Sequence, residues 1–230
     1  MDNGSLCVMI FVRDPVLGEV KTRLAGKLGE IKTLEFYKDC VTQMLSALES
    51  SGYPVRVHYF PWDRGESVSR WLGNQHHYIP QEGSDLGERM ASAFLRSFSD
   101  GYSRSILMGS DIPEFTGSIL QESASALIQN QSVIGPSADG GYYLIGFRSS
   151  SFLPKAFQNI RWGSGSVFQD TVNRILETGL SIHILPMLQD IDELEDLIDF
   201  LNRISPGSLS PFSSKNYLDL RNRSKTGEIE

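Results

Sequence analysis

Residues 6–24 read Leu6-Cys7-Val8-Met9-Ile10-Phe11-Val12 followed by Arg13-Asp14-Pro15-Val16-Leu17-Gly18-Glu19-Val20-Lys21-Thr22-Arg23-Leu24. The first seven residues are continuously apolar and rich in β-branched side chains, which predicts a strand buried on both faces, as in a parallel sheet. The loop after it carries three cations, Arg13, Lys21 and Arg23. Open α/β sheets bind ligands at the carboxyl ends of their strands. We therefore expect an anion site here, the alternative being a solvated charged turn.

The rest of the chain alternates short apolar strands with amphipathic helices. The clearest helix is 30–50, where apolar side chains recur every three or four residues. Further strands are expected at 55–60, 77–79, 105–108, 132–135, 142–147 and 181–185, and helices at about 67–72, 85–98, 117–129, 167–177 and around 194–201. Asp85 is the expected N-cap of its helix. The alternation predicts a layered, mostly parallel sheet.

Composition limits the possible classes of protein. The chain has 230 residues, of which 40% are hydrophobic, and a net charge of -7. We expect one domain over residues 1–205 and a polar tail, 206–230, that is ordered only in part. The acidic balance argues against nucleic-acid or anionic-membrane partners. With no signal-like or membrane-spanning segment we expect a cytoplasmic protein, in which Cys7 and Cys40 are reduced core residues.

Several short blocks extend the pattern of the first loop. In chain order they are Lys21-Thr22-Arg23-Leu24, Asp85-Leu86-Gly87-Glu88-Arg89-Met90, Gly109-Ser110-Asp111-Ile112-Pro113, Gly135-Pro136-Ser137-Ala138-Asp139-Gly140-Gly141-Tyr142-Tyr143, Trp162-Gly163-Ser164 and Asp190-Ile191-Asp192. Together they resemble the nucleotide-diphospho-sugar transferase family, which includes glycosyltransferases associated with arsenosugar biosynthesis. Leu17 and Ser164 depart from the family, which usually has Pro and Thr there.

The resemblance implies an α/β protein with the three-layer α/β/α GT-A fold and a mixed, mostly parallel sheet. That fold is shared with the nucleotidyltransferases that make molybdenum-cofactor and phospholactate nucleotides. A nucleotide-sugar or nucleotide donor and a small-molecule acceptor are the implied partners. Oligomeric state stays open.

Three aspartates are candidate ligands for Mg²⁺ or Mn²⁺. Asp111 ends a strand in a tight turn, which is how a hard cation is presented to substrate phosphates, and the resemblance implies a metal-binding acid here. The alternative is that Asp111 caps the turn. Asp190 and Asp192 would share one face of an extended segment. Asp192 could instead be the N-cap of the last helix.

The segment around Asp139-Gly140 has two interpretations. It is a strong hairpin signal for a type I′ turn. Asp139, Gly140 and Gly141 could also contact a sugar or acceptor, since glycine lets a ligand approach the backbone. Trp162 could stack on a sugar or base, although packing beneath a loop is the more common use of tryptophan.

No zinc-helix spacing, serine-hydrolase elbow or P-loop is present, so those classes are disfavoured. We expect Arg13, Gly18, Lys21, Arg23 and Ser110 to hold the donor phosphates, with Asp111, Asp190 and Asp192 holding the metal. Asp85, Gly140, Gly141 and Trp162 would contact substrate, and Asp139 and Lys21 would be catalytic. The family resemblance favours glycosyl transfer, the alternatives being nucleotidyl transfer and a non-catalytic nucleotide-sugar-binding protein.

Overall fold

Seven strands in the described part of the chain form one mixed sheet. They are β1 (Leu6–Arg13), β2 (Val55–Phe60), β3 (His77–Pro80), β4 (Arg104–Met108), β5 (Ser132–Pro136), β6 (Tyr142–Arg148) and β7 (Ile182–Ile184). The computed structural model describes residues 5–204 together with Phe212, Tyr217, Leu220 and Asn222. The strand order is β3-β2-β1-β4-β6-β5-β7, and β6 runs antiparallel to both of its neighbours. The other pairings are parallel, which confirms the predicted sheet.

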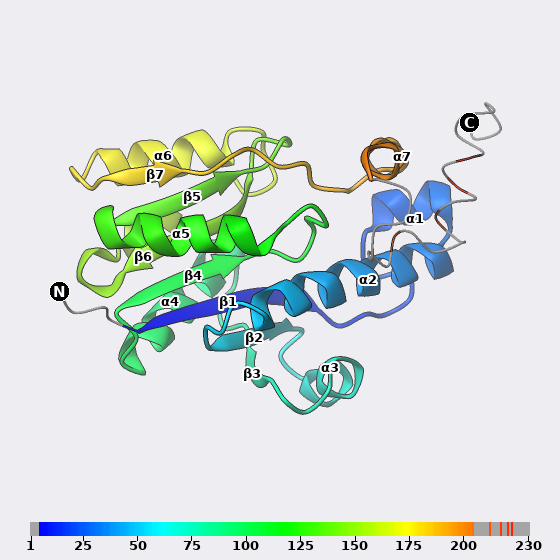
Figure 1. The fold of residues 1–230 in the computed structure, drawn as a ribbon, viewed down its shortest axis with the longest axis horizontal. Helices are drawn as coiled ribbons and strands as arrows, with labels where there is room; N and C mark the ends of the chain where they lie inside the picture. Colours follow the sequence, from blue (N-terminus) through cyan, green and yellow to red (C-terminus); the bar gives the residue numbers. More distant parts are fainter. Residues whose placement is uncertain (1–4, 205–211, 213–216, 218–219, 221, 223–230) are drawn as a thin grey trace.

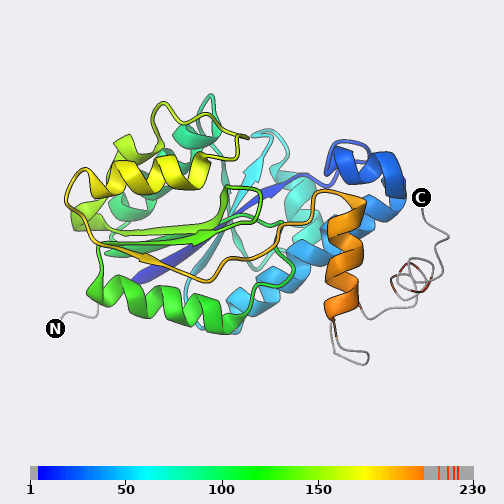
Figure 2. The ribbon, with the colours of Figure 1, turned by 90° about the horizontal axis from the view of Figure 1, so that it is seen from above.

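Helices cover both faces of this sheet and make the three layers expected (Figures 1 and 2). On one face lie α2 (Glu30–Glu49) and α5 (Gly117–Gln129), and on the other α4 (Leu86–Ser99) and α6 (Val167–Leu176). Strand β1 is buried on both sides because nearly all its residues are apolar, and Cys7 and Cys40 are buried free thiols as predicted.

A third apolar cluster lies at one end of the molecule. It joins α1 (Thr22–Leu28), the first half of α2 and α7 (Leu194–Arg203), with Leu24, Phe36 and Leu197 fully buried. Residues from the C-terminal segment complete it: Phe212, Tyr217 and Leu220 are buried there. The Tyr217 hydroxyl donates a hydrogen bond to Asp39 Oδ2 at 2.8 Å. Apart from these three residues and Asn222, the predicted tail, 206–230, lies outside the described residues.

The predicted helix and strand positions agree closely with the structure, with two additions. Helix α1 was not predicted, and two 3₁₀ turns, η1 (Ser149–Ser151) and η2 (Pro154–Phe157), lie between the predicted strand 142–147 and the predicted helix 167–177. The short third helix, α3, is Gly65–Leu72. The Asp85 carboxylate accepts from the Glu88 N–H at 2.8 Å, which confirms it as the N-cap of α4.

The turn between β5 and β6 is not the predicted type I′ turn. That turn needs positive φ at both central residues, and here Gly140 has φ 87° while Asp139 does not have positive φ. The connection closes instead over five residues, with the Ser137 N–H donating to the Gly141 carbonyl and the Gly140 N–H to the Ser137 carbonyl. In this wider turn the Asp139 side chain accepts hydrogen bonds from Ser137 and Gly141.

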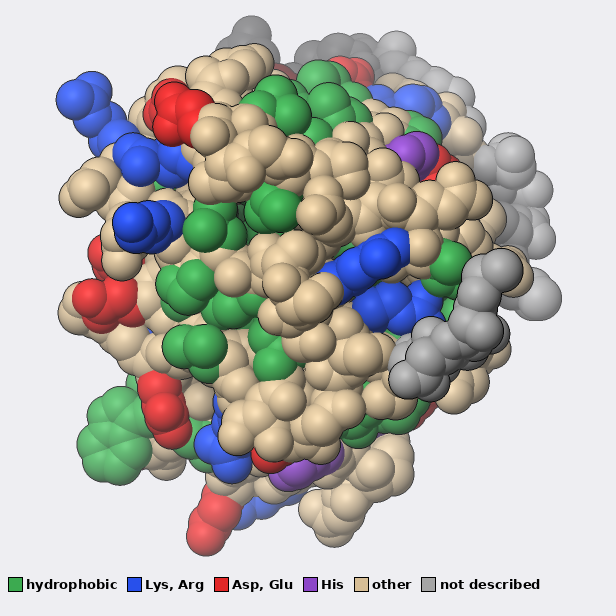
Figure 3. Space-filling model, turned by 90° about the vertical axis from the view of Figure 1, so that its left-hand side faces the viewer, with side chains coloured by type: hydrophobic (Ala, Val, Ile, Leu, Met, Phe, Trp, Pro, Cys, Tyr) green, Lys and Arg blue, Asp and Glu red, His purple; other side chains and the backbone are tan. Residues whose placement is uncertain are grey.

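No helix among the described residues combines the length and apolarity that a bilayer crossing needs. Figure 3 shows the end of the molecule that lies at the left of Figure 1, where β1 begins. On that face Lys and Arg side chains lie in small groups among Asp, Glu and uncharged side chains, without a large patch of one sign. This face offers no broad anion-binding surface.

Candidate functional site

A cavity of about 670 Å³ lies at the carboxyl ends of β1 and β4. Nine of the thirteen predicted site residues line it: Arg13, Lys21, Ser110, Asp111, Asp139, Gly141, Trp162, Asp190 and Asp192. The sheet explains the convergence, because β1 and β4 are adjacent parallel strands and therefore end at the same edge. The bridge between Ser137 and Leu188 draws the segment that leads to Asp190 toward the β5–β6 turn.

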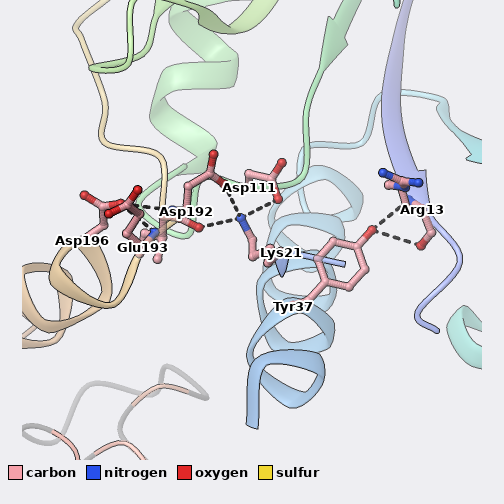
Figure 4. A network of polar contacts seen from close by, with 8 residues as sticks. Arg13, Lys21, Tyr37, Asp111, Asp192, Glu193 and Asp196 are labelled. Atoms are coloured by element: carbon pink, nitrogen blue, oxygen red, sulfur yellow. Dashed lines mark hydrogen bonds and ion pairs between the residues drawn. The ribbon is translucent and has the colours of Figure 1, made fainter. Parts of the chain in front are cut away.

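Lys21 lies between two of the predicted metal ligands. Its Nζ is 2.8 Å from Asp111 Oδ1 and 3.4 Å from Asp192 Oδ1, and it donates to the Ile191 carbonyl oxygen at 2.6 Å (Figure 4). The Lys21 side chain is only 4% exposed, whereas those of Asp111 and Asp192 are about half exposed. A buried ammonium therefore ties the end of β4 to the segment before α7.

The charge of Lys21 is stabilised in place. Burial by itself would lower the pKa of the ammonium, but the carboxylates of Asp111 and Asp192 outweigh burial and raise the pKa above its ordinary value. The backbone of Lys21 has φ 45° and ψ 51°, the left-handed conformation that few residues other than glycine adopt. This unusual conformation starts α1 and accompanies the inward placement of the side chain.

Asp192 is not the N-cap of the last helix, which corrects that alternative. The cap is Glu193, whose side chain accepts from the backbone of Asp196 while the Asp196 carboxylate accepts from the Glu193 N–H at 2.9 Å. This reciprocal capping box satisfies the helix start without Asp192. The Asp192 carboxylate is therefore available to Lys21, and its free oxygen to a ligand.

Asp139 and Asp190 add carboxylates on the same side of the cavity. Asp139 Oδ1 accepts from the Ser137 hydroxyl and from the Gly141 N–H at 2.8 Å, so Oδ2 is the oxygen left for a ligand. Burial, with the neighbouring Asp139 carboxylate second, raises the pKa of Asp190 to about 6. Asp190 Oδ1 is buried and makes no hydrogen bond with a described residue.

Arg13 lies apart from these carboxylates. Tyr37 accepts from its backbone N–H at 2.8 Å and donates to its carbonyl at 3.0 Å, so this one hydroxyl holds the end of β1 (Figure 4). Burial, reinforced by the Asp111 charge, raises the pKa of Tyr37, which stays protonated. The Arg13 guanidinium carbon lies 5.6 Å from the centroid of the Phe60 ring.

Sequence reasoning assigned no role to Arg89, Phe60 or Tyr37, although all three line the cavity. The Arg89 guanidinium carbon lies 4.0 Å from the centroid of Phe60. Arg89 lies in the block 85–90 that carries the family resemblance, and this block was the sequence signal that could have indicated a role for it. Phe60 at the end of β2 and Tyr37 in the middle of α2 gave no signal, since apolar and aromatic residues in such elements are usually core.

Gly18, Arg23, Asp85 and Gly140 do not line the cavity. Gly18 has φ 77° and lies against Glu30, and Arg23 is exposed on α1. Any side chain at Gly140 would collide with the Gly165 backbone, so the close approach there is made by the protein's own chain.

Trp162 packs against the protein as predicted and also lines the cavity, while its stacking on a sugar or base stays a prediction. It lines the cavity, and a Cβ on Gly87 would lie 2.8 Å from its ring, so the indole packs on the first turn of α4. Its ring also meets Tyr142 edge-on, at 6.5 Å between centroids. Packing against α4 fixes the ring at the wall of the cavity.

The carboxylates of the cavity are the type of ligand that a divalent cation binds. Carboxylate oxygens are the ligands of Mg²⁺ and Mn²⁺, and Mg²⁺ often uses one or two carboxylates with the remaining positions filled by water and substrate phosphates. The described residues contain no cluster of three or more side chains that could hold a metal by themselves. One carboxylate oxygen of Asp111 and one of Asp192 contact Lys21. Their other oxygens are suited to a cation whose coordination shell is completed by a ligand.

Residues 43–164 match a family model described as "Uncharacterized protein conserved in bacteria (DUF2064)". The chain belongs to this family. It is also 39% identical to a "putative nucleotide-diphospho-sugar transferase" from Desulfovibrio desulfuricans G20, whose crystal structure it matches with a TM-score of 0.88 over 96% of this chain and 95% of that one. No curated protein gives a significant match.

More distant solved structures share the fold. The inositol-1-phosphate CTP transferase from T. maritima matches with a TM-score of 0.57 and 15% identity, over 97% of this chain and 98% of that one. Rv0371c from Mycobacterium tuberculosis H37Rv, solved as a complex with manganese, matches with a TM-score of 0.55 and 12% identity, over 87% of this chain and 100% of that one. At these identities the likeness is one of architecture.

Proposed function

We propose that this DUF2064 protein is a transferase that uses a nucleotide-activated donor, and specifically a nucleotide-diphospho-sugar-dependent glycosyltransferase. The observation that carries the proposal is a single cavity, at the carboxyl ends of β1 and β4, lined by cations and by four aspartates. Its volume of about 670 Å³ lies within the range of small-molecule sites. The 39% identity to a protein described as a nucleotide-diphospho-sugar transferase supports the donor class.

In this proposal the cations at the end of β1 bind the donor diphosphate. Arg13 offers a planar fork and Lys21 a point charge. The three N–H donors of Lys21 already have three acceptors within the protein, so a phosphate oxygen must replace one of them. Asp111 and Asp192 are half exposed, so each can turn toward solvent when its ion pair with Lys21 breaks.

Asp111 and Asp192 would hold a Mg²⁺ or Mn²⁺ ion, with Asp190 two residues before Asp192 in the chain. Such an ion neutralises the charge that develops on the leaving diphosphate. The manganese complex of Rv0371c, a protein of the same architecture, supports this part of the proposal. Lys21 would keep the two carboxylates close together until donor and metal arrive.

Asp139 would orient and deprotonate the acceptor hydroxyl. Its Oδ1 is fixed by Ser137 and Gly141, which leaves Oδ2 to accept the hydroxyl proton. The carboxyl of Asp190, whose pKa burial raises to about 6, lies beside Asp139 in the same cavity. Trp162 and Tyr142 border the same space and would bound the acceptor.

Product analysis separates glycosyl from nucleotidyl transfer. The protein would be incubated with nucleotide-diphospho-sugars or nucleoside triphosphates, Mn²⁺ and pools of small acceptors, and the products identified by mass spectrometry. Glycosyl transfer releases a nucleoside diphosphate, whereas nucleotidyl transfer consumes a triphosphate and releases diphosphate. Binding of nucleotide-sugars without turnover on any acceptor would favour a non-catalytic binding protein.

A further inference from the structure

The cavity has a second charged region, on the side of β2 and α4. It consists of Arg13, Arg89 and the Phe60 ring, which we call the arginine platform. Arg13 is the last residue of β1, Phe60 the last residue of the adjacent β2, and Arg89 lies in the first turns of α4. The guanidinium carbons of Arg13 and Arg89 lie 5.6 and 4.0 Å from the centroid of the Phe60 ring.

Neither arginine of the platform is neutralised by a described carboxylate. Elsewhere in the described chain Arg56, Arg64, Arg96 and Arg203 each lie within ion-pair distance of an aspartate or glutamate. Arg89 donates through Nε to the Gly83 carbonyl at 3.1 Å, which orients the group and leaves its two terminal nitrogens for a ligand. What sets Arg13 and Arg89 apart from the other described arginines is that these two line the cavity, in a chain with a net charge of -7.

Lys21 differs from these arginines in how its donors are used. Its ammonium is buried and engaged by Asp111, Asp192 and the Ile191 carbonyl (Figure 4). An anion that enters the cavity therefore meets donors on the arginine platform without breaking an ion pair between described residues. Contact with the Phe60 ring reduces the freedom that each guanidinium would lose on binding, and for Arg89 the hydrogen bond from Nε reduces it further.

We propose that Arg89, together with Arg13, binds a phosphate or carboxylate group in this cavity. Two planar forks on one ring suit an anion with several oxygens, because each guanidinium can donate two parallel hydrogen bonds. The group belongs to the donor, as its diphosphate, or to the acceptor, as its own anionic group. The inference rests on the proposed function for the identity of the whole ligand, although anion binding itself does not depend on it.

The test is calorimetric titration with inorganic pyrophosphate, without metal, of the wild type and of Arg89→Met, Arg89→Lys and Arg13→Met. Arg96→Met is the matched control, since Arg96 lies on the same helix, is about half exposed and pairs with Glu82 outside the cavity. We expect Arg89→Met and Arg13→Met each to weaken binding about tenfold or more, corresponding to the loss of a charge-assisted contact. Arg89→Lys should fall in between, and Arg96→Met should match the wild type.

A nucleotide-diphospho-sugar titration then assigns the source of the anion. If Arg89→Met weakens nucleotide-sugar and pyrophosphate binding alike, the donor diphosphate occupies the platform. If it weakens only pyrophosphate binding, and pyrophosphate still binds with the nucleotide-sugar present, the platform serves the acceptor. Either result supports the inference.

Pyrophosphate affinity that is unchanged in both Arg89→Met and Arg13→Met, with wild-type melting temperatures, would overturn it. The Arg89→Lys variant guards against misfolding, because it keeps the charge and most of the aliphatic stem. If the protein binds a nucleotide with the same affinity in wild type and Arg89→Met, and does not bind pyrophosphate, this inference is wrong and the proposed function still stands. Pyrophosphate binding that depends on Arg89, with no nucleotide bound, would do the reverse.

Discussion

Lys21 shows how one side chain ties the candidate metal site to the candidate phosphate site. Its ammonium lies where a cation between Asp111 and Asp192 would also be drawn, so lysine and metal compete for the same carboxylates. The competition was hidden in the sequence, which predicted a shared metal site for Asp111 and Asp192 but assigned Lys21 to the donor phosphates. Only the fold brings the three together.

Removing this lysine should strengthen metal binding in the absence of nucleotide. In Lys21→Met the stem is retained but the competing charge is lost, and we expect Mn²⁺ affinity to rise about tenfold, since 1.4 kcal/mol corresponds to a factor of ten. Calorimetric titration with Mn²⁺ measures it. Lys27→Met is the control, because Lys27 pairs with Glu195 on the exposed surface. A Lys21→Met variant that binds Mn²⁺ no better than the control would contradict competition.

His58 gives a prediction about pH. Burial, followed by the charge of Arg56, lowers its pKa to about 3, so the folded protein holds the imidazole neutral. The unfolded chain, with a pKa near 6.5, binds a proton first as the pH falls, and stability is therefore lost progressively below about pH 6.5. Between pH 7 and pH 5 the wild type should lose about 2 kcal/mol more than His58→Phe, given about 1.4 kcal/mol per pH unit. Urea denaturation at both pH values measures this, and equal losses would show that His58 does not titrate as described.

At the scale of the elements, the apolar runs and helical periodicities predicted most of the fold. Strand β1 was predictable because burial on both faces requires nearly all of its residues to be apolar. Helix α5 was predictable because the residues that it buries recur at helical spacing. Helix α1 was missed since it is short, begins Thr22-Arg23, and is stabilised by contacts with α7 that lie far away in the sequence. The type I′ prediction failed because the Asp139 carboxylate bonds within a wider turn.

Asp85 is the N-cap of α4, and substituting it distinguishes this structural role from the predicted substrate contact. Asp85→Ala should lower stability by about 1 kcal/mol, the usual effect of losing a cap, and so reduce the melting temperature by about 2–4 °C in a chain of this size. Gln121→Ala, an exposed position on α5, is the control. Since Asp85 does not line the cavity, acceptor KM should stay at its wild-type value. A raised KM with unchanged stability would restore the substrate role.

For the molecule as a whole, the C-terminal segment is expected to contribute to stability. Phe212 is 2% exposed and packs on Phe36 and Phe200, at 5.5 and 5.1 Å between ring centroids. Phe212→Ala should cost about 3–5 kcal/mol, as for other buried phenylalanines, measured by urea denaturation. Ile31→Ala, at a position 68% exposed, is the control. A Phe212→Ala protein as stable as that control would show that this packing does not hold in solution.

The proposed function requires that the cavity at the ends of β1 and β4 binds a nucleotide-activated donor. Calorimetric titration with a panel of UDP- and GDP-sugars and nucleoside triphosphates, with and without Mn²⁺, tests it most directly. We expect saturable one-to-one binding of at least one nucleotide-sugar, tighter with Mn²⁺ and weakened in Asp111→Asn. An absence of nucleotide binding under every condition, in protein with a normal melting transition, would contradict it.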